Sequence, residues 1–297
     1  MRIGYPCINT SIGCSASRTF RLRSYCPERL LSTVKENLQC LKLILEYNYN
    51  KDFLFFRIGS ELVPFASHEI CNFDWQSHFI KELREIGNFI KKHHMRISMH
   101  PDQFVLINAK DSQIVEKSIR ELEYHTEVLD LMGLDRTAKI QIHVGGIYND
   151  KDASVNRFIE SYHYLDKRIK KRLVIENDDH LYSVNDCLRI HEKTAIPILF
   201  DSFHHEIFNN GESLSNALEI CALTWKKMDG PLMVDYSSQS LGAKKGAHTD
   251  HINRNHFLSF LKKAGRIDFD LMLEIKDKEK SAEDALKIFK LFSGTKI

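Results

Sequence analysis

Short apolar segments alternate with longer amphipathic segments along this chain. The short segments have the length and the alternation of buried strands, and they cover 2–5, 53–59, 95–100, 139–145, 172–177, 197–201, 232–236 and 269–276. The segments between them repeat their apolar residues with helical periodicity, over 27–47, 74–93, 112–132, 153–170, 183–193, 212–227, 252–264 and 281–292. Start signals support several of these helices. Pro27 stands in a first turn, Asp74 precedes an apolar periodicity, and Ser281 with Asp284 has the spacing of a capping box.

Eight strands that are each followed by a helix predict an α/β protein with the fold of a (β/α)8 TIM barrel. The rival architecture is a doubly wound open sheet, which usually has a glycine-rich turn after an early strand. The sequence contains no GxGxxG motif, and no linker rich in Pro, Gly or Ser divides it. We therefore expect a single barrel domain over residues 1–297, with its active site at the C-terminal face of the strands.

Alternation along the predicted strands directs one set of side chains into the barrel. Residues two apart share a face of a strand, so Ser98 lies on the same face as His100. In the same way, Val174 lies on the same face as Glu176, and Leu199 on the same face as Asp201. Six successive strands then end in an inward imidazole or carboxylate. These residues are His100, His143, Glu176, Asp201, Asp235 and Glu274.

Each of these residues alone has an ordinary structural explanation, since a histidine at a strand end is usually hydrogen-bonded and an aspartate after a strand usually caps a helix. Their convergence is different, because carboxylates gathered in a closed site repel one another unless cations lie among them. His204 and His248 follow two of the strands and extend the set. Imidazole and carboxylate ligands suit manganese, zinc, magnesium or iron. We predict two or three metal ions bridged by a carboxylate such as Glu176, an arrangement that acts on phosphodiesters.

Composition excludes several other classes. The chain has 297 residues, of which 43% are hydrophobic and 28% are charged, and its net charge is +2. Seven scattered cysteines without a CxxC pair do not indicate a disulfide scaffold or a cysteine zinc site. No secretion signal and no uncharged apolar run of membrane-spanning length is present, so we expect a cytoplasmic protein without membrane contact.

Several motifs occur in one order that resembles the UV damage endonuclease family. They are YPCINTS, RIGSELVPFASH, SMHPDQF, IQIHVGG, RLVIENDD, FDSFHH, and YSS followed by HTDHI, and the similarity runs from about residue 2 to 275. The resemblance implies a TIM barrel related to endonuclease IV. It also implies a DNA repair enzyme that nicks immediately 5′ of ultraviolet photoproducts and leaves a 3′ hydroxyl and a 5′ phosphate. The substrate is then damaged double-stranded DNA, acted on by a monomer that needs no protein partner.

The resemblance also implies roles for individual residues. The metal ligands of the family fall on His100, His143, Glu176, Asp201, His204, His248 and Glu274. Divalent ions, with Mn²⁺ as the first choice and Mg²⁺ or Zn²⁺ as alternatives, would be held by Glu176 and Glu274 as catalytic carboxylates. His68 resembles a site-facing histidine of the family and is included with the catalytic group; its alternative role is a surface histidine.

Other residues of the motifs are expected to contact DNA. Gln103 and Phe104 match the pair that probes the duplex, although the family usually has tyrosine at the second position. Tyr5 and Asn9 resemble residues that line the damage pocket; otherwise they are a packed tyrosine and a turn-capping asparagine. The loop residues Lys244 and Lys245, with Arg18, Arg21 and Arg23, lead from the same face and are candidates for phosphate contacts.

The seventh strand departs from the family pattern. Met233 stands where the family has a lysine that is found carboxylated, and Asp235 stands where it has a histidine. Methionine cannot carry that modification, but Asp235 can still bind a hard cation. We expect an intact cluster with an altered third site. A damage sensor that has lost its chemistry is the alternative that this departure leaves open. A metal-dependent sugar isomerase or epimerase is a second alternative, because related barrels bind divalent metals with similar sets of His, Asp and Glu.

Overall fold

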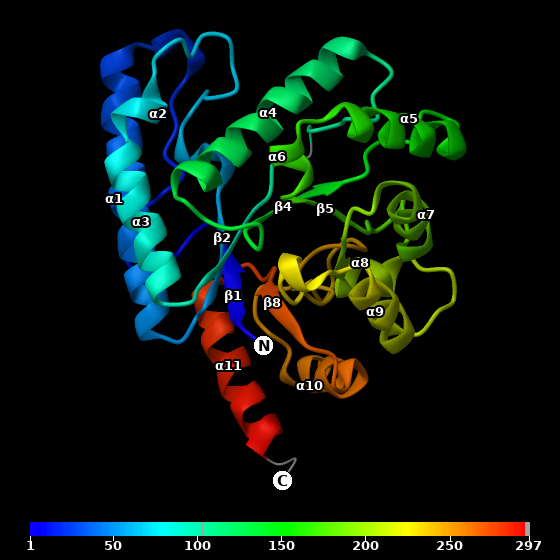
Figure 1. The fold of residues 1–297 in the computed structure, drawn as a ribbon. Coiled ribbons are helices and arrows are strands. Elements are labelled where there is room, and N and C mark those ends of the chain that lie inside the picture. The colour runs from blue at the N-terminus through cyan, green and yellow to red at the C-terminus, as the bar shows by residue number, and fades with distance from the viewer. Residues whose placement is uncertain (102–103, 295–297) are drawn as a thin grey trace.

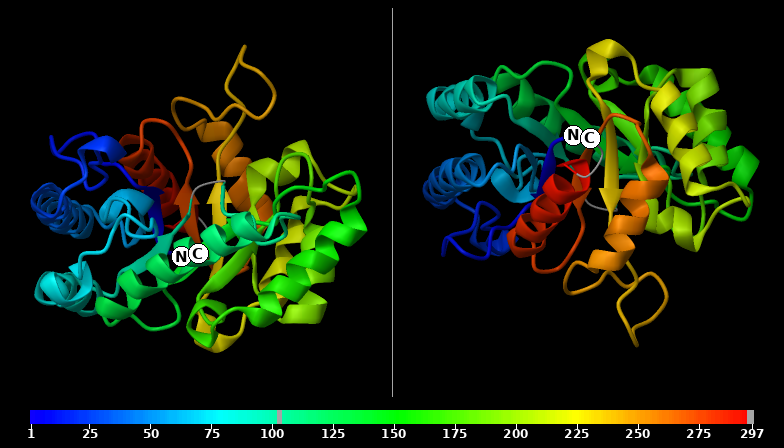
Figure 2. Two further views of the ribbon diagram at one scale, coloured as in Figure 1. Left: turned by 90° about the horizontal axis from the view of Figure 1, so that it is seen from above. Right: turned by 90° about the horizontal axis from the view of Figure 1, so that it is seen from below.

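Eight parallel strands close into a barrel in the computed structural model, which describes residues 1–101 and 104–294. Each strand pairs with the next one along the chain, and β8 pairs with β1 to complete the ring. Helices surround this ring, as the views from several sides show (Figures 1 and 2). The strands are β1 (Ile3–Pro6), β2 (Phe55–Ile58), β3 (Arg96–Met99), β4 (Lys139–His143), β5 (Leu173–Glu176), β6 (Ile198–Asp201), β7 (Leu232–Tyr236) and β8 (Phe269–Leu273).

The helices follow the strands in the expected order. They are α1 (Pro27–Asn50), α2 (Trp75–His78), α3 (Ile80–Lys92), α4 (Ser112–Leu131), α5 (Lys151–Tyr164), α6 (Lys167–Lys170), α7 (Val184–Thr194), α8 (Ser202–Ile207), α9 (Leu214–Leu223), α10 (Arg254–Ala264) and α11 (Glu279–Gly294). Short 3-10 turns occupy Leu22–Ser24, Ser60–Leu62 and Lys227–Asp229. Within the described ranges, no helix has both the length and the apolar character needed to cross a bilayer.

The predicted elements agree with the structure except at a few ends and at α8, which was not predicted. Pro27 begins α1 and the Asp74 side chain caps α2, as expected. The prediction that Ser281 caps the last helix is wrong, because α11 already begins at Glu279. The Ser281 hydroxyl instead donates to Asp277 and accepts from the backbone of Ile252, so it ties the helix to the loop before α10.

An apolar layer inside the barrel confirms the predicted alternation. Phe55 packs there with inward side chains of four other strands, separately from the larger core between barrel and helices. These side chains are Val174, Leu199, Met233 and Met272. Since Met233 is fully buried in this layer, it fills the barrel and has no charged or oxygen-bearing group to offer to the site above.

Below this layer, paired charges fill the end of the barrel where the strands begin. Lys139 and Arg136 donate to Asp229 at 2.6 and 2.7 Å, and Arg96 donates to Asp270 at 2.9 Å. The two carboxylates are almost completely buried, so each needs these partners. This end of a barrel serves stability, and the chemistry lies at the other end.

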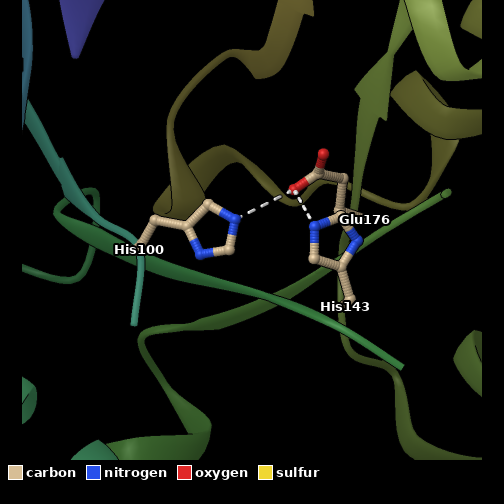
Figure 3. A group of neighbouring side chains, drawn as sticks. All are labelled: His100, His143 and Glu176. Carbon is tan, nitrogen blue, oxygen red and sulfur yellow. Dashed lines mark ion pairs between the residues drawn. The ribbon is translucent and has the colours of Figure 1, made fainter. Parts of the chain in front are cut away.

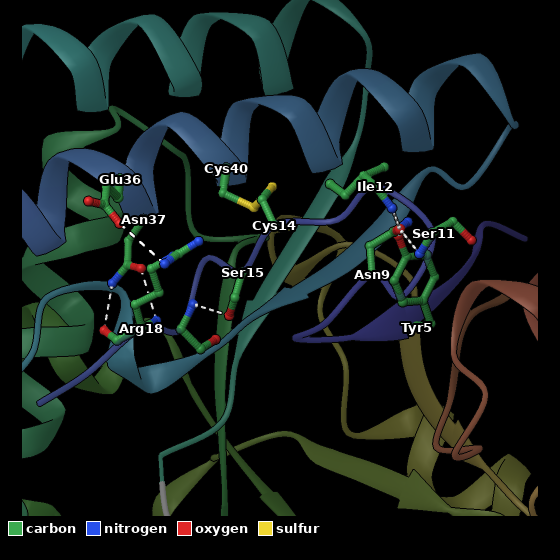
Figure 4. The surroundings of a disulfide bond; sticks show 11 residues. Tyr5, Asn9, Ser11, Ile12, Cys14, Ser15, Arg18, Glu36, Asn37 and Cys40 are labelled. Atoms are coloured by element: carbon green, nitrogen blue, oxygen red, sulfur yellow. Dashed lines mark hydrogen bonds and ion pairs between the residues drawn. A yellow bond between two sulfur atoms is a disulfide. The ribbon is translucent and has the colours of Figure 1, made fainter.

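The loop after β1 is fastened to α1 by covalent and hydrogen bonds (Figure 4). Cys14 and Cys40 form a disulfide, a pairing that the scattered cysteines did not indicate. The side-chain amide of Asn37 also accepts from the backbone of Arg18 and donates to its carbonyl. The loop that carries the basic residues Arg18, Arg21 and Arg23 is therefore held against the helix.

Candidate metal centre

Two imidazoles face one carboxylate oxygen at the C-terminal ends of β3, β4 and β5 (Figure 3). His100 Nε2 lies 3.7 Å and His143 Nε2 lies 3.9 Å from Oε2 of Glu176. Glu176 is buried, whereas the two rings are partly open to the barrel mouth. One nitrogen from each ring and one carboxylate oxygen lie within 4.8 Å of one another, which is the spacing of a candidate cation site.

The other oxygen of Glu176 faces a second group. His204 Nδ1 lies 3.4 Å from Oε1 of Glu176 and 3.6 Å from Oδ2 of Asp201. The position of His204 follows from the local fold, because Asp201 ends β6 and its Oδ1 accepts from the backbone N–H of His204 at the start of α8. Glu176 thus joins two candidate cation sites through different oxygens.

Backbone carbonyls orient two of the imidazoles. His204 Nδ1 lies 3.0 Å from the carbonyl of Asn177, and His248 Nδ1 lies 2.7 Å from the carbonyl of Glu274. A carbonyl only accepts hydrogen bonds, so each Nδ1 carries a proton. In the neutral His248 ring the lone pair is then on Nε2, which is the usual way in which a protein prepares a histidine to bind a metal. His204 Nδ1, which also faces Glu176 and Asp201, must lose its proton before it can bind a cation between them.

Arg57 of β2 lies among these residues, although the sequence analysis did not identify it. Its Nη2 donates to Oδ2 of Asp235 at 2.6 Å, and its Nη1 donates to Glu274. Gln141 donates to the same Asp235 oxygen at 2.8 Å and to Glu176 at 2.9 Å. Oδ2 of the predicted ligand Asp235 therefore already accepts from two donors of the chain itself, whereas its Oδ1 accepts from none of the described residues.

Burial and neighbouring charges act in opposite directions on the carboxyl groups. Burial alone would raise the pKa of Glu176, but His143, His204 and His100 lower it well below its ordinary value. Burial is likewise outweighed at Glu274, where Arg57 lowers the pKa to about 2. Burial prevails at Asp201, whose pKa rises to about 6. The carboxylates of the cluster thus carry more negative charge than the basic side chains of the protein around them neutralise.

The imidazoles of the cluster differ in the direction in which their pKa is shifted. Burial lowers the pKa of His100 to about 4, so its ring is neutral and can bind a cation at physiological pH. Burial also disfavours the charged form of His204, but Asp201 and Glu176 outweigh it and raise the pKa of this ring. Without a metal ion, His204 is therefore protonated and neutralises part of the carboxylate charge.

Unsatisfied atoms show that divalent cations fit this site. Within the described chain, four buried atoms of the predicted metal ligands have no hydrogen-bond partner: Asp201 Oδ2, Asp235 Oδ1, His100 Nδ1 and His143 Nδ1. The carboxylate oxygens can only accept, and buried acceptors without donors are costly. A bound cation would satisfy Asp201 Oδ2, which lies beside His204 and faces the centre.

A cavity of about 460 Å³ opens above the cluster. Its wall includes Arg57, Glu274 and the three imidazoles of His100, His143 and His248. Lys276 and Lys278, which follow β8, line it as well and were not identified from the sequence. Positive side chains at the mouth of a metal centre favour a phosphate substrate.

Phe104, one of the two residues expected to probe DNA, lines a second cavity. The ring of Phe104 is 72% exposed on the connection between β3 and α4. His68 lines this second cavity of about 420 Å³ together with Phe104, so the structure does not bring it among the metal ligands. Gln103 lies outside the described residues.

Tyr5 and Asn9 lie in the core of the protein. Tyr5 is fully buried, and its hydroxyl donates to Asn48 and accepts from Asn9. Asn9 is 2% exposed and its side-chain oxygen accepts from the backbone of Ser11 and Ile12. Both side chains are thus buried and hydrogen-bonded within the protein, as a packed tyrosine and a turn-capping asparagine are.

Comparison with known proteins decides the family. The sequence profile described as UV-endonuclease UvdE matches residues 1–296. The chain belongs to this family. It is 39% identical to the UV DNA damage endonuclease of Clostridium perfringens (strain 13 / Type A), over 99% of this chain and 72% of that protein. It is 34% identical to the enzyme of the same name from Bacillus thuringiensis subsp. konkukian (strain 97-27), over 94% of this chain and 91% of the other.

Solved structures agree with this assignment. The crystal structure of SacUVDE matches with a TM-score of 0.95 and 47% identity, over 99% of both chains. Endonuclease IV from Thermus thermophilus has a TM-score of 0.59 at 13% identity, over 86% of this chain and 94% of that one, and shows a shared fold only. The predictions of the family, of a TIM barrel and of a DNA repair nuclease are confirmed.

Proposed function

We propose that this enzyme hydrolyses the phosphodiester immediately 5′ of an ultraviolet photoproduct in duplex DNA and leaves a 3′ hydroxyl and a 5′ phosphate. The observation that carries the proposal is the position of Glu176, whose two oxygens face two separate groups of imidazole and carboxylate ligands. Two-metal phosphodiester hydrolysis depends on such a shared carboxylate. Relatives over almost the whole chain bear the name UV DNA damage endonuclease, which supports the substrate.

Two divalent ions, with Mn²⁺ as the first candidate and Mg²⁺ or Zn²⁺ as alternatives, fit the cluster. His100 and His143 would hold one ion, Asp201 and His204 the other, and Glu176 would be shared. His248 and Glu274 stand at the cavity wall to complete the ligand sets. When bound, such ions acidify water and stabilise the negative charge that develops on the leaving oxygen.

Charge balance supports two ions better than three. Four carboxylates and the single guanidinium of Arg57 leave three negative charges, so two divalent ions give a centre with one positive charge, which attracts a phosphate. One ligand atom each of Asp201, Asp235 and Glu274 also lies within the spacing of a cation site, but an ion there would lie next to the positive guanidinium of Arg57, which pairs with Asp235 and Glu274. We therefore propose that Asp235 binds Arg57 instead of a metal ion, and that Arg57 fixes Glu274. In this proposal the third metal site, which Met233 and Asp235 were expected to alter, holds the arginine.

The residues around the mouth would bind the damaged duplex. Lys276 and Lys278 line the cavity and are candidates to hold phosphates beside the scissile bond. Phe104 presents an exposed apolar ring that can occupy the space of an extruded lesion, and the family resemblance pairs it with Gln103. Because a photoproduct is already poorly stacked, its extrusion costs less than that of normal bases, which is a source of selectivity.

Incision of an end-labelled duplex that contains one defined photoproduct tests this function. Wild-type protein should nick 5′ of the lesion with Mn²⁺, should stop when chelator is added, and should spare the undamaged duplex. Glu176→Gln should bind the damaged duplex but not nick it. A wild-type protein that binds without nicking under any divalent metal would instead be a damage sensor. A wild-type protein that only isomerises ketoses would support the sugar isomerase alternative.

A further inference from the structure

The loop between β7 and α10 carries the most exposed apolar residue among the large hydrophobic side chains of the described chain. Leu241 is 98% exposed, whereas the neighbouring strand residue Tyr236 is fully buried. Both views of Figure 2 show this gold to orange loop standing out beyond the surrounding helices. An isolated exposed leucine is common on protein surfaces, so its surroundings decide whether it has a role.

This loop is a hydrogen-bonded hairpin. Gln239 and His248 form an antiparallel bridge, and Ser240 donates its N–H to the carbonyl of Ala247 at 2.8 Å. The side chain of Gln239 closes the loop from inside, since its amide donates to the carbonyl of Lys244 and its oxygen accepts from Gly246, both at 2.9 Å. The backbone thus holds Leu241 outward.

The base of the hairpin is joined to the metal centre. His248 ends the bridge, lines the cavity above the cluster, and contacts the carbonyl of Glu274 through Nδ1 at 2.7 Å. The hairpin and this candidate ligand are therefore one unit.

Barrel geometry places Leu241 opposite Phe104. In a closed ring of eight strands, β3 and β7 are four strands apart in either direction, so their C-terminal connections stand on opposite sides of the mouth. Phe104 follows β3 and is 72% exposed, and Leu241 follows β7. The connections that carry these two exposed apolar side chains thus begin on opposite sides of the barrel mouth.

Positive charge on the same hairpin indicates DNA as the occupant. Lys244 and Lys245 are exposed and lie three and four residues after Leu241. Lys245 Nζ has a 3.4 Å contact to the carbonyl of Ile207, and no carboxylate of the described chain forms an ion pair with it. An apolar side chain beside two exposed cations fits stacked bases that are bordered by phosphates.

We propose that Leu241 is a second wedge, which enters the base stack on the side of the lesion away from Phe104 while Lys244 and Lys245 hold the adjacent phosphates. Unstacking from both sides would leave the damaged dinucleotide without neighbours and favour its extrusion. This inference rests on the proposed function, because it needs a damaged duplex at the barrel mouth.

A duplex with 2-aminopurine next to the photoproduct tests the wedge, since this base fluoresces more strongly when it is unstacked. The variant is Leu241→Ser, and the matched control is Leu223→Ser, which changes another leucine that is 86% exposed, at the end of α9. Both substitutions leave the core and the ligands untouched. Mn²⁺ content and thermal midpoint should therefore equal those of wild-type protein in both variants.

Leu241→Ser should lose most of the fluorescence increase and bind the damaged duplex about tenfold more weakly, the factor expected when a leucine side chain is no longer buried. Leu223→Ser should behave as wild type. Equal fluorescence and affinity in the two variants would overturn the wedge. Failure of wild-type protein to nick would count against the proposed function alone, because the fluorescence measurement requires binding but no incision.

Discussion

Arg57 and Asp235 form a buried ion pair in which Nη2 of the arginine lies 2.6 Å from Oδ2 of the aspartate. The same guanidinium binds Glu274, so one side chain from β2 neutralises carboxylates from two strands across the barrel. Asp235 and Glu274 together raise the pKa of Arg57 despite its burial, so its charge is permanent. The chain itself thus supplies one of the cations that the cluster needs.

Replacing Arg57 by methionine should destabilise the metal-free protein. The substitution leaves the buried Asp235 and the partly buried Glu274 without their cation, and breaking a buried ion pair in this way costs about 3–5 kcal/mol. Urea unfolding in chelator measures the loss. Mn²⁺ should restore part of the stability of Arg57→Met. Arg57→Lys, which keeps the charge, should lose less; similar losses in the two variants would count against the pairing.

Mn²⁺ should bind more tightly as the pH rises. The raised pKa of His204 means that its ring is protonated in the metal-free protein at neutral pH, and a protonated imidazole has no lone pair to bind with. Binding therefore releases a proton, and the affinity should rise about tenfold per pH unit for each proton released. Calorimetric titrations in two buffers of different ionisation enthalpy count these protons. Binding without proton release would contradict the assignment of His204 as a ligand.

The paired charges at the end of the barrel where the strands begin should affect stability and leave the incision chemistry unchanged. Burial would raise the pKa of Asp229, but Lys139 and Arg136 lower it below its ordinary value. The contribution of the Asp229 ion pairs to the free energy of unfolding is therefore complete at neutral pH, and it is lost as the pH falls through this lowered pKa. Asp229→Asn should lower the free energy of unfolding by about 3–5 kcal/mol at pH 7 and by less near pH 3. The incision rate of Asp229→Asn at 25 °C should equal that of wild type. A lower incision rate would contradict the view that this end of the barrel serves stability and the other end serves the chemistry.

The exposed ring of Phe104 should contribute to lesion binding through stacking. Phe104→Ala should lower kcat/KM on a photoproduct duplex by about 5- to 150-fold, because a base stacked on an aromatic ring gains about 1–3 kcal/mol. Phe104→Tyr keeps the flat ring and should retain activity. Steady-state incision of the damaged duplex measures both variants. Full activity of the alanine variant would show that this ring only covers the barrel mouth.

Alternation along the strands was sufficient to predict much of the centre. Once β5 and β6 were assigned, Glu176 and Asp201 had to face the interior, because side chains of a strand alternate strictly. The same rule directs Arg57, two residues after Phe55, into the barrel, but a cation among strand-end ligands does not fit the pattern of a metal site and was not predicted. α8 was also missed, since its six residues are too few to show a helical period.

Other features depend on contacts that the sequence does not show. Resemblance suggested that Tyr5 lines the DNA site, yet alternation in β1 directs Gly4 and Pro6 inward and Tyr5 toward the helices. The disulfide joins Cys14 and Cys40 across 26 residues of sequence. It could not be predicted until the loop was seen to lie against α1.

The most direct test of the account is the anomalous scattering of a crystal grown with Mn²⁺. We expect two peaks that share Glu176. One should lie within about 2.0–2.4 Å of nitrogens of His100 and His143, and the other at the same range from Asp201 and His204. No peak should lie between Asp235 and Arg57. Absence of Mn²⁺ at Glu176, or a third peak that displaces Arg57 from Asp235, would contradict the account.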